Sequence, residues 1–175
     1  TLLPDPLSPR LRAYRDRNEH HLLLKVSTRD AEATRVFLDR FFGDRAGDFF
    51  ACDAEEGRKA FLLRFAVAGA AVRYRPVHAA PVEDIVALDI ALRRDDRDWV
   101  ERLPADVADT MIARLYYGHF FCHVFHQDYI VKKGVEPLAV EHRLWDLLDA
   151  RGAEYPAEHN VGHLYRAKPA LAGFY

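Results

Sequence analysis

Histidine, cysteine and carboxylate side chains are concentrated in two short stretches of this sequence. The first stretch contains His119, Cys122, His123, His126 and Asp128, and the second contains Glu158 and His159. Imidazole nitrogens, thiolates and carboxylate oxygens are the usual ligands of Zn²⁺ and related divalent ions. A neutral imidazole can also accept a proton near pH 7. The two stretches are therefore candidates for a metal site and for acid–base chemistry.

The first stretch lies in an aromatic-rich segment, residues 116–132, which we expect to form one long strand. Because side chains alternate along a strand, His119 and His123 would share one face, and His126 would lie on the other face with Cys122. A site that contains both His119 and His126 then needs a bulge or a turn, and no glycine lies between them. Two interpretations stay open: a metal site, or histidines on both faces of a strand that neighbouring groups satisfy.

The second stretch, EHNVG at residues 158–162, follows a predicted helix, Gly152 and Pro156. Polar loops that are held by such residues carry binding and catalytic groups more often than core segments do. The alternative is a turn whose polar side chains only cap the local backbone. The sequence favours neither interpretation strongly.

A third candidate is a helix that begins near residue 53, in which Arg58, Lys59 and Arg64 surround an apolar set of Phe61, Leu62 and Phe65. This pattern is typical of a helix that lies on a membrane surface. It is also typical of a helix that packs on a core and keeps a charged outer face.

Composition limits the class of protein. Half of the 175 residues are apolar and the formal net charge is −2, so the chain can bury a core and has no general attraction for nucleic acid. Cys52 and Cys122 lie too far apart to indicate a disulfide framework. No run of about 18 apolar residues occurs, so we expect any membrane contact to be peripheral. The ends, Thr1 and Tyr175, lead us to expect a part of a longer protein.

Apolar periodicity and turn residues predict the elements that must position these groups. Strands are predicted at residues 20–27, 48–52, 70–75, 85–92 and 116–132. Helices are predicted at residues 30–42, 53 to about 68, 105–115 and 136–151. Asp53 and Glu56 have the spacing of a capping box at the start of the second helix. This order predicts an α+β fold, an antiparallel sheet with flanking helices on one side.

Long segments of the chain resemble one enzyme family, the quinone-dependent respiratory D-lactate dehydrogenases of bacteria. These segments are EHHLLLKV (19–26), VEDIVALDIALRR (82–94), YYGHFFCHVFHQDYIVKKG (116–134) and RGAEYPAEHNVGHLYRA (151–167). The wider group, the vanillyl-alcohol-oxidase-type flavoproteins, carries a GHxGDGNxH-like strand and an EHGxG-like loop. Gly118, His119 and His126 match the ends of the strand motif, whereas FCHV stands in place of GDGN. Glu158, His159 and Gly162 match the loop motif, with Asn160 where the group usually has glycine.

The resemblance implies that His119, His126 and Glu158 hold a divalent metal and that His159 is the catalytic base. It also implies an FAD domain built mainly from residues upstream of this chain. Three regions are then expected. Residues 1–17 would end a membrane-contact region, residues 18–149 would form a cap domain with a membrane-contact insertion at about 56–79, and residues 150–175 would return toward the FAD domain. Arg58, Lys59 and Arg64 would contact the membrane.

The implied enzyme oxidises D-lactate to pyruvate with FAD and passes electrons to a membrane quinone. It would bind anionic lipid on the cytoplasmic side of the bacterial inner membrane as a peripheral protein, with no nucleic acid partner. This chain has no glycine-rich phosphate cradle of its own, so the isolated chain is expected to be inactive. The alternative is a non-catalytic membrane-docking or structural module.

Overall fold

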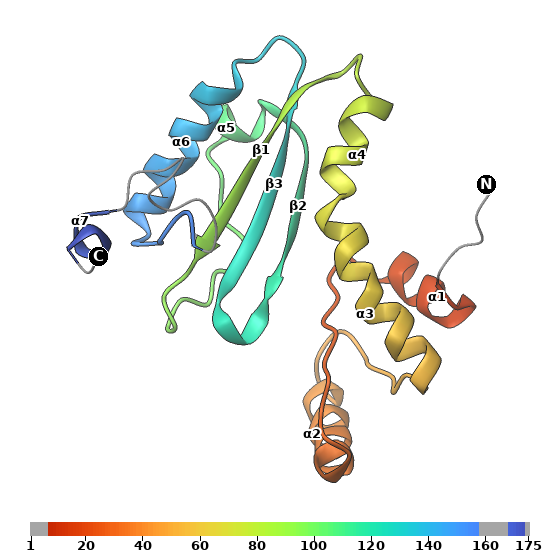
Figure 1. Cartoon of the computed structure of the whole chain (residues 1–175). Coiled ribbons are helices and arrows are strands. Elements are labelled where there is room, and N and C mark those ends of the chain that lie inside the picture. Colours follow the sequence, from red (N-terminus) through yellow and green to blue (C-terminus); the bar gives the residue numbers. More distant parts are fainter. Residues whose placement is uncertain (1–6, 158–167, 174–175) are drawn as a thin grey trace. The chain divides into compact units, whose positions relative to one another are not determined.

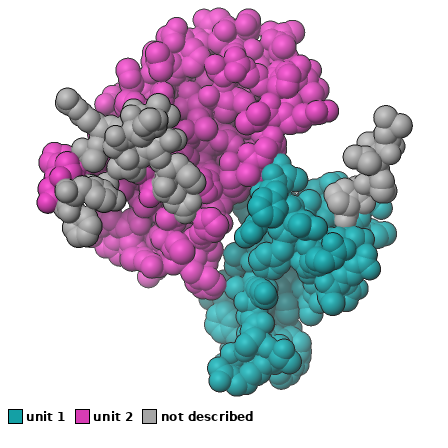
Figure 2. Space-filling view, in the orientation of Figure 1, with its two compact units in different colours: residues 1–66 teal, residues 67–175 magenta. Residues whose placement is uncertain are grey.

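The computed structural model describes residues 7–157 and 168–173 (Figure 1). The chain divides into two compact units, residues 1–66 and residues 67–175 (Figure 2). This division differs from the regions predicted above, with their boundaries at 17/18 and 149/150. Those regions concern contacts with a membrane and with an FAD domain, so they stay predictions.

The first unit is helical in the residues that the structure describes. Its elements are α1 (Pro9–Arg17), a 3₁₀ helix η1 (Thr28–Asp30), α2 (Ala31–Phe42) and α3 (Ala54–Ala68), the last of which crosses into the second unit. The capping box that begins α3 is confirmed. The Glu56 amide donates to Asp53 Oδ1 at 2.8 Å, and the Asp53 amide donates to Glu56 Oε2 at 3.2 Å. Helix α2 also agrees with the predicted helix at 30–42.

Glu56 also ties α1 to the start of α3. Ser8 Oγ and Arg10 Nε both donate to Glu56 Oε1, at 3.0 and 3.1 Å, and a second Arg10 nitrogen pairs with Oε2. These hydrogen bonds, the one from Arg10 above all, lower the pKa of the Glu56 carboxyl from 4.5 to about 2. The carboxylate therefore holds two helices that are 46 residues apart in the chain.

Two predicted strands of the first unit are wrong. Residues 20–27 and 48–52 have an irregular conformation, and no strand occurs among the described residues of this unit. A strand needs a neighbour to satisfy its backbone N–H and C=O groups. The described part of the unit contains no such neighbour, so the apolar run at 22–26 lies exposed instead of in a sheet.

The second unit is built on a three-stranded antiparallel sheet in the order β1-β3-β2. Its elements are α4 (Ala70–Val77), β1 (Val82–Ala91), α5 (Ala105–Ala108), β2 (Met111–His119), a 3₁₀ helix η2 (Phe120–Cys122), β3 (Val124–Lys132), α6 (Pro137–Ala150) and α7 (Pro169–Ala172). The α+β class and the antiparallel sheet are confirmed. Strand β1 agrees with the prediction at 85–92.

Helix α6 covers one face of this sheet. Glu136 caps its N-terminus by accepting the Leu138 amide at 3.3 Å, and Gly152 follows its end with a φ of 66°. The core between α6 and the sheet is apolar, and its largest members include Leu88, Ile90, Phe125, Tyr129, Val140, Leu144 and Leu148. The predicted helix at 136–151 is therefore confirmed.

Helix α4 replaces the strand predicted at 70–75. Gly69 has near-helical angles, φ −95° and ψ −2°, so the chain continues to turn after α3. The helix contacts β1 and β3, and Figure 1 shows it on the opposite side of the sheet from α6. The sheet consequently has helices on both sides, not on one side as predicted.

The helix predicted at 105–115 is also wrong beyond its first turn. It ends at Ala108 as α5, and β2 begins at Met111. The apolar and aromatic side chains of β2 are better accommodated in the sheet, where this strand pairs with β3. The segment predicted as one strand at 116–132 is therefore two strands joined by a turn.

Candidate functional site

The turn between β2 and β3 decides where the histidines lie. Phe120–Cys122 form the short helix η2, and His123 follows in a left-handed conformation with a φ of 56°. The chain reverses direction there, so residues before and after the turn belong to two antiparallel strands. The alternation of side chains along one strand therefore no longer relates His119 to His126. The expectation that His119 and His126 point to opposite faces of one strand is therefore wrong.

Strand register places a set of polar side chains on one face of the sheet. Asp89 on β1, His126 on β3 and Tyr117 on β2 are direct cross-strand partners, and directly opposed residues share a face. His119 and Asp128 lie on the same face, each two positions from a member of this row. We call these five residues the polar face. Helix α6 packs on the other face of the sheet.

His119 and His126 lie within reach of one ion. Their rings are edge to face with centroids 6.0 Å apart. An ion about 2.1 Å from one nitrogen of each ring would leave the centroids no more than about 6.5 Å apart. The separation of the two rings therefore allows a shared divalent cation. No cluster of three or more potential metal ligands occurs among residues 7–157 and 168–173.

His126 is the more enclosed of the two histidines. Its Nδ1 lies 3.2 Å from Asp89 Oδ1, and its ring stacks on Tyr117 with centroids 5.1 Å apart and an interplanar angle of 28°. Tyr117 in turn donates its hydroxyl to Asp128 Oδ2 at 3.2 Å. Burial raises the pKa of the Asp128 carboxyl, and burial together with the Asp128 charge raises the pKa of Tyr117 to about 12. The Tyr117 phenol thus keeps its proton and stays a donor at neutral pH.

His123 and Cys122 do not join this cluster. His123 Nδ1 donates to the Arg93 carbonyl oxygen, 3.0 Å away, and the ring lies beside Trp99 and Phe125. Phe125 belongs to the apolar core. Cys122 is an exposed free thiol in the turn. The His123 side chain therefore joins the β2–β3 turn to the segment that follows β1.

Glu158 and His159, the remaining predicted metal ligand and the predicted base, lie outside the described residues. The described chain leads up to them along the edge of the sheet. Glu154 pairs with Ala91, and the Ala157 amide donates to the Asp89 carbonyl at 2.8 Å. The last described residue before Glu158 is thus hydrogen-bonded to the cross-strand partner of His126.

Asp89 and Tyr117 were not singled out from the sequence. Asp89 is the single acidic residue within the run IVALDIAL, and an acid in an otherwise apolar strand is a signal that its side chain has a partner. Tyr117 carries no such signal, because tyrosine is common in strands. Its place beside His126 follows only from the register of β2 with β3.

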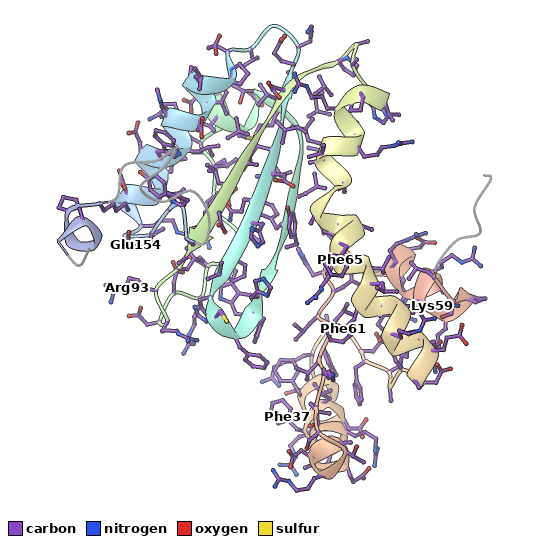
Figure 3. The ribbon with its side chains drawn as sticks, in the orientation of Figure 1. Phe37, Lys59, Phe61, Phe65, Arg93 and Glu154 are labelled. Atoms are coloured by element: carbon purple, nitrogen blue, oxygen red, sulfur yellow. The ribbon has the colours of Figure 1, made fainter. Side chains whose placement is uncertain are left out.

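The first unit has a different kind of surface, which exposes many large apolar side chains. Among its described residues, only Leu7 and Ala60 are buried apolar residues. The exposed set contains Leu22, Leu23, Leu24, Val26, Val36, Phe37, Phe41, Phe61, Leu62 and Phe65. Figure 3 labels three of the phenylalanines, one on α2 and two on α3. Exposed apolar residues in this number mark a surface that contacts a protein, a membrane or a ligand.

The predicted basic residues of α3 lie among these apolar side chains. Arg58 is exposed, Lys59 pairs with Glu55 at 2.7 Å, and the Arg64 guanidinium lies 4.6 Å from the centroid of the Phe65 ring. The ion pair with Glu55 offsets part of the Lys59 charge. Arg75, on α4, pairs with Asp84 at 2.8 Å.

In the described part of the chain, none of the helices has the length and apolar composition needed to cross a bilayer.

Fold and surfaces together define a two-unit α+β chain: a sheet with a polar, histidine-bearing face, and a helical unit with an apolar and basic surface. A family model described as "D-lactate dehydrogenase, membrane binding" matches residues 1–175, and the chain belongs to this family.

Three curated relatives are named quinone-dependent D-lactate dehydrogenase. The protein from Escherichia coli is 55% identical over 99% of this chain, and that from Haemophilus influenzae is 53% identical over 99%. The protein from Corynebacterium glutamicum is 45% identical over 98% of this chain. The aligned segment covers 30%, 31% and 30% of these relatives, respectively, so the chain spans about a third of their length.

Proposed function

We propose that this chain is the cap and membrane-binding part of an FAD-dependent D-lactate dehydrogenase. The whole protein would oxidise D-lactate to pyruvate and pass electrons to membrane quinone. The observation that carries this proposal is the 45–55% identity to quinone-dependent D-lactate dehydrogenases along nearly the entire chain. The two dissimilar surfaces support it, because such an enzyme needs one surface at its substrate and another at the bilayer.

On the catalytic side, we assign the polar face to the substrate site. D-lactate must lose a hydroxyl proton and a hydride, and FAD, when bound, supplies the hydride acceptor. His159 would accept the hydroxyl proton, since a neutral imidazole suits this role near pH 7. His119, His126 and Glu158 would hold a divalent cation that orients the substrate oxygens. The 6.0 Å separation of the two imidazoles and the bond from Ala157 to Asp89 support this grouping.

On the membrane side, we assign the apolar and basic surface of α2 and α3 to a peripheral contact with the cytoplasmic side of the bacterial inner membrane. Arg58, Lys59 and Arg64 would face anionic headgroups, and neighbouring phenylalanines would enter the boundary between headgroups and acyl chains. The exposed fractions of Phe37 and Phe65, both 63%, support this assignment. Aromatic rings are costly to leave in water when they can enter an interface.

The proposal is tested on the full-length protein bound to vesicles. D-lactate should bleach the flavin absorbance, and added quinone should restore it. His159→Asn should lower kcat by about 100- to 10,000-fold while flavin content and melting temperature stay unchanged. A flavin that D-lactate fails to reduce would refute the dehydrogenase assignment, and normal turnover by His159→Asn at full flavin occupancy would remove this histidine from the reaction.

The isolated chain of 175 residues separates the enzyme from the alternative of a docking module. We expect it to bind vesicles but to show no flavin absorbance and no turnover of D-lactate with an artificial acceptor. Turnover with bound FAD by this chain alone would contradict the placement of the flavin domain upstream.

A further inference from the structure

The carboxylate of Asp89 lies beside the imidazole of His126 on neighbouring strands. The two residues are direct partners in the β1–β3 ladder, and Asp89 Oδ1 is 3.2 Å from His126 Nδ1. Only 13% of the Asp89 side chain and 21% of the His126 side chain are exposed. This carboxylate, mostly shielded from water, has no part in the proposed reaction, so its position next to a candidate metal ligand needs an explanation.

The contact determines which nitrogen of His126 is available. A carboxylate has no proton to give, so at 3.2 Å it electrostatically favours the form of His126 that carries a proton on Nδ1. The proton-free lone pair is then on Nε2, at the opposite end of the ring. Tyr117 stacks on one side of the ring and restricts its rotation. The Asp89 carboxylate thus favours one tautomer of the imidazole, and the Tyr117 ring favours one orientation.

We propose that Asp89 is a positioning residue for a divalent cation bound by His126 and His119. Its carboxylate acts through the His126 ring, fixing the tautomer that presents Nε2 to the ion. This inference rests on the metal site of the proposed function. A carboxylate behind a ligating histidine orients the ring and increases its basicity, and its loss commonly weakens metal binding 10- to 100-fold.

The backbone of Asp89 supports the same arrangement. Its carbonyl accepts the Ala157 amide at 2.8 Å, directly before Glu158 in the chain. One residue of β1 therefore contacts His126 through its side chain and the segment leading to Glu158 through its main chain. A side-chain substitution leaves the main-chain bond in place, so it tests the carboxylate alone.

The experiment uses the full-length protein with its flavin bound and its metal removed. It measures the affinity for Zn²⁺ by competition with a chelator. Asp89→Ala removes the acceptor and should raise the Kd about 10- to 100-fold. Asp89→Asn keeps the size and one acceptor oxygen, so its Kd should lie between those of wild type and Asp89→Ala. The matched control is Asp84→Asn, which removes a carboxylate from the same strand, where it pairs with Arg75, and should leave the Kd unchanged. Melting temperatures of the metal-free proteins record any structural loss separately.

The outcomes distinguish this inference from the metal site on which it rests. Weaker binding by Asp89→Ala with partial rescue by Asp89→Asn supports the positioning role. Wild-type affinity in Asp89→Ala, with His126→Gln impaired, overturns the role of Asp89 and leaves the metal site intact. If wild type binds no Zn²⁺, or if His126→Gln binds as wild type does, the metal site fails and this inference fails with it.

Discussion

The imidazoles of His119 and His126 lie edge to face with their centroids 6.0 Å apart, on the two strands of one hairpin. In a continuous strand, seven residues of separation would have put them on opposite faces. The turn at Phe120–Cys122 and the left-handed His123 bring them to the same face. The predicted metal site depends on this reversal more than on the sequence motif.

If these rings share an ion, replacing either one should impair metal binding. We expect His119→Gln and His126→Gln, each in the full-length protein, to weaken Zn²⁺ affinity by more than the 10- to 100-fold loss typical of a residue behind a ligand, and so to lower Zn²⁺ occupancy after dialysis. Elemental analysis of the dialysed protein measures the occupancy. His142→Gln, which changes an exposed histidine on α6, is the control. Equal occupancy in all four proteins would count against a site at these rings.

The basic residues of α3 should contribute the salt-sensitive part of membrane binding. A basic residue near an anionic surface contributes about 1 kcal/mol. Replacing Arg58, Lys59 and Arg64 together with Gln should therefore weaken binding to anionic vesicles by roughly 100-fold at low salt. Lys59→Gln alone should have less effect than Arg58→Gln, because Lys59 already pairs with Glu55. Vesicle sedimentation over a range of NaCl concentrations measures this. Arg143→Gln on α6 is the single-charge control, and an equal loss in that variant would indicate a general charge effect.

The exposed phenylalanines should contribute a part of membrane binding that salt does not remove. Phe37, Phe61 and Phe65 lie on the same unit as the basic residues, and apolar burial is not screened by ions. Changing all three to Ser should reduce the vesicle-bound fraction that persists in 1 M NaCl (about a 3 Å screening length). Leu138→Ser, at an exposed site on α6, should leave that fraction unchanged. If wild type leaves the vesicles completely at high salt, the apolar contribution is absent.

The hydrogen bonds between Glu56 and α1 should weaken in acid. The folded pKa of this carboxyl, about 2, is below its ordinary value of 4.5, so folding favours the charged form. Its stabilising contribution is complete above about pH 4.5 and is lost as the pH falls toward 2. The protection factors of the α1 amides, which correct for the pH dependence of intrinsic exchange, should therefore fall over this interval. Glu56→Gln should lower these protection factors already at pH 7 and lose their acid dependence, whereas the exposed Glu19→Gln should behave as wild type.

Gly118 should be required for the hairpin that carries the histidines. A Cβ at this position would lie 2.4 Å from the Val124 carbonyl oxygen and 2.9 Å from the Phe125 Cα, both of which are backbone atoms that cannot easily move. Gly118→Ala should therefore lower the melting temperature by several degrees, since about 1 kcal/mol shifts it by about 2–4 °C in a protein of 150–250 residues. Gly57→Ala in α3, where the nearest atom would be 3.9 Å away, should be neutral or stabilising. Equal melting temperatures for the two variants would contradict the close approach.

Local patterns in the sequence determined the elements that depend on near neighbours in the chain. The capping box of Asp53 and Glu56 satisfies amides within a few residues, so the start of its helix could be predicted. The alternation of Val86, Leu88 and Ile90 likewise predicted β1, because a strand buried on one face requires that period. The class of fold follows from these elements.

Only the tertiary structure decided the arrangement of the site. Apolar and aromatic residues run through residues 116–132 without a glycine at the turn, so sequence pattern could not reveal the reversal at His123. Residues 70–75 form a helix because the chain keeps turning at Gly69 and packs α4 on the sheet. The contact between Asp89 and His126 joins residues 37 positions apart, and it exists because the register of β1 with β3 makes them partners. Register results from packing the whole sheet against its helices, which no local stretch of sequence encodes.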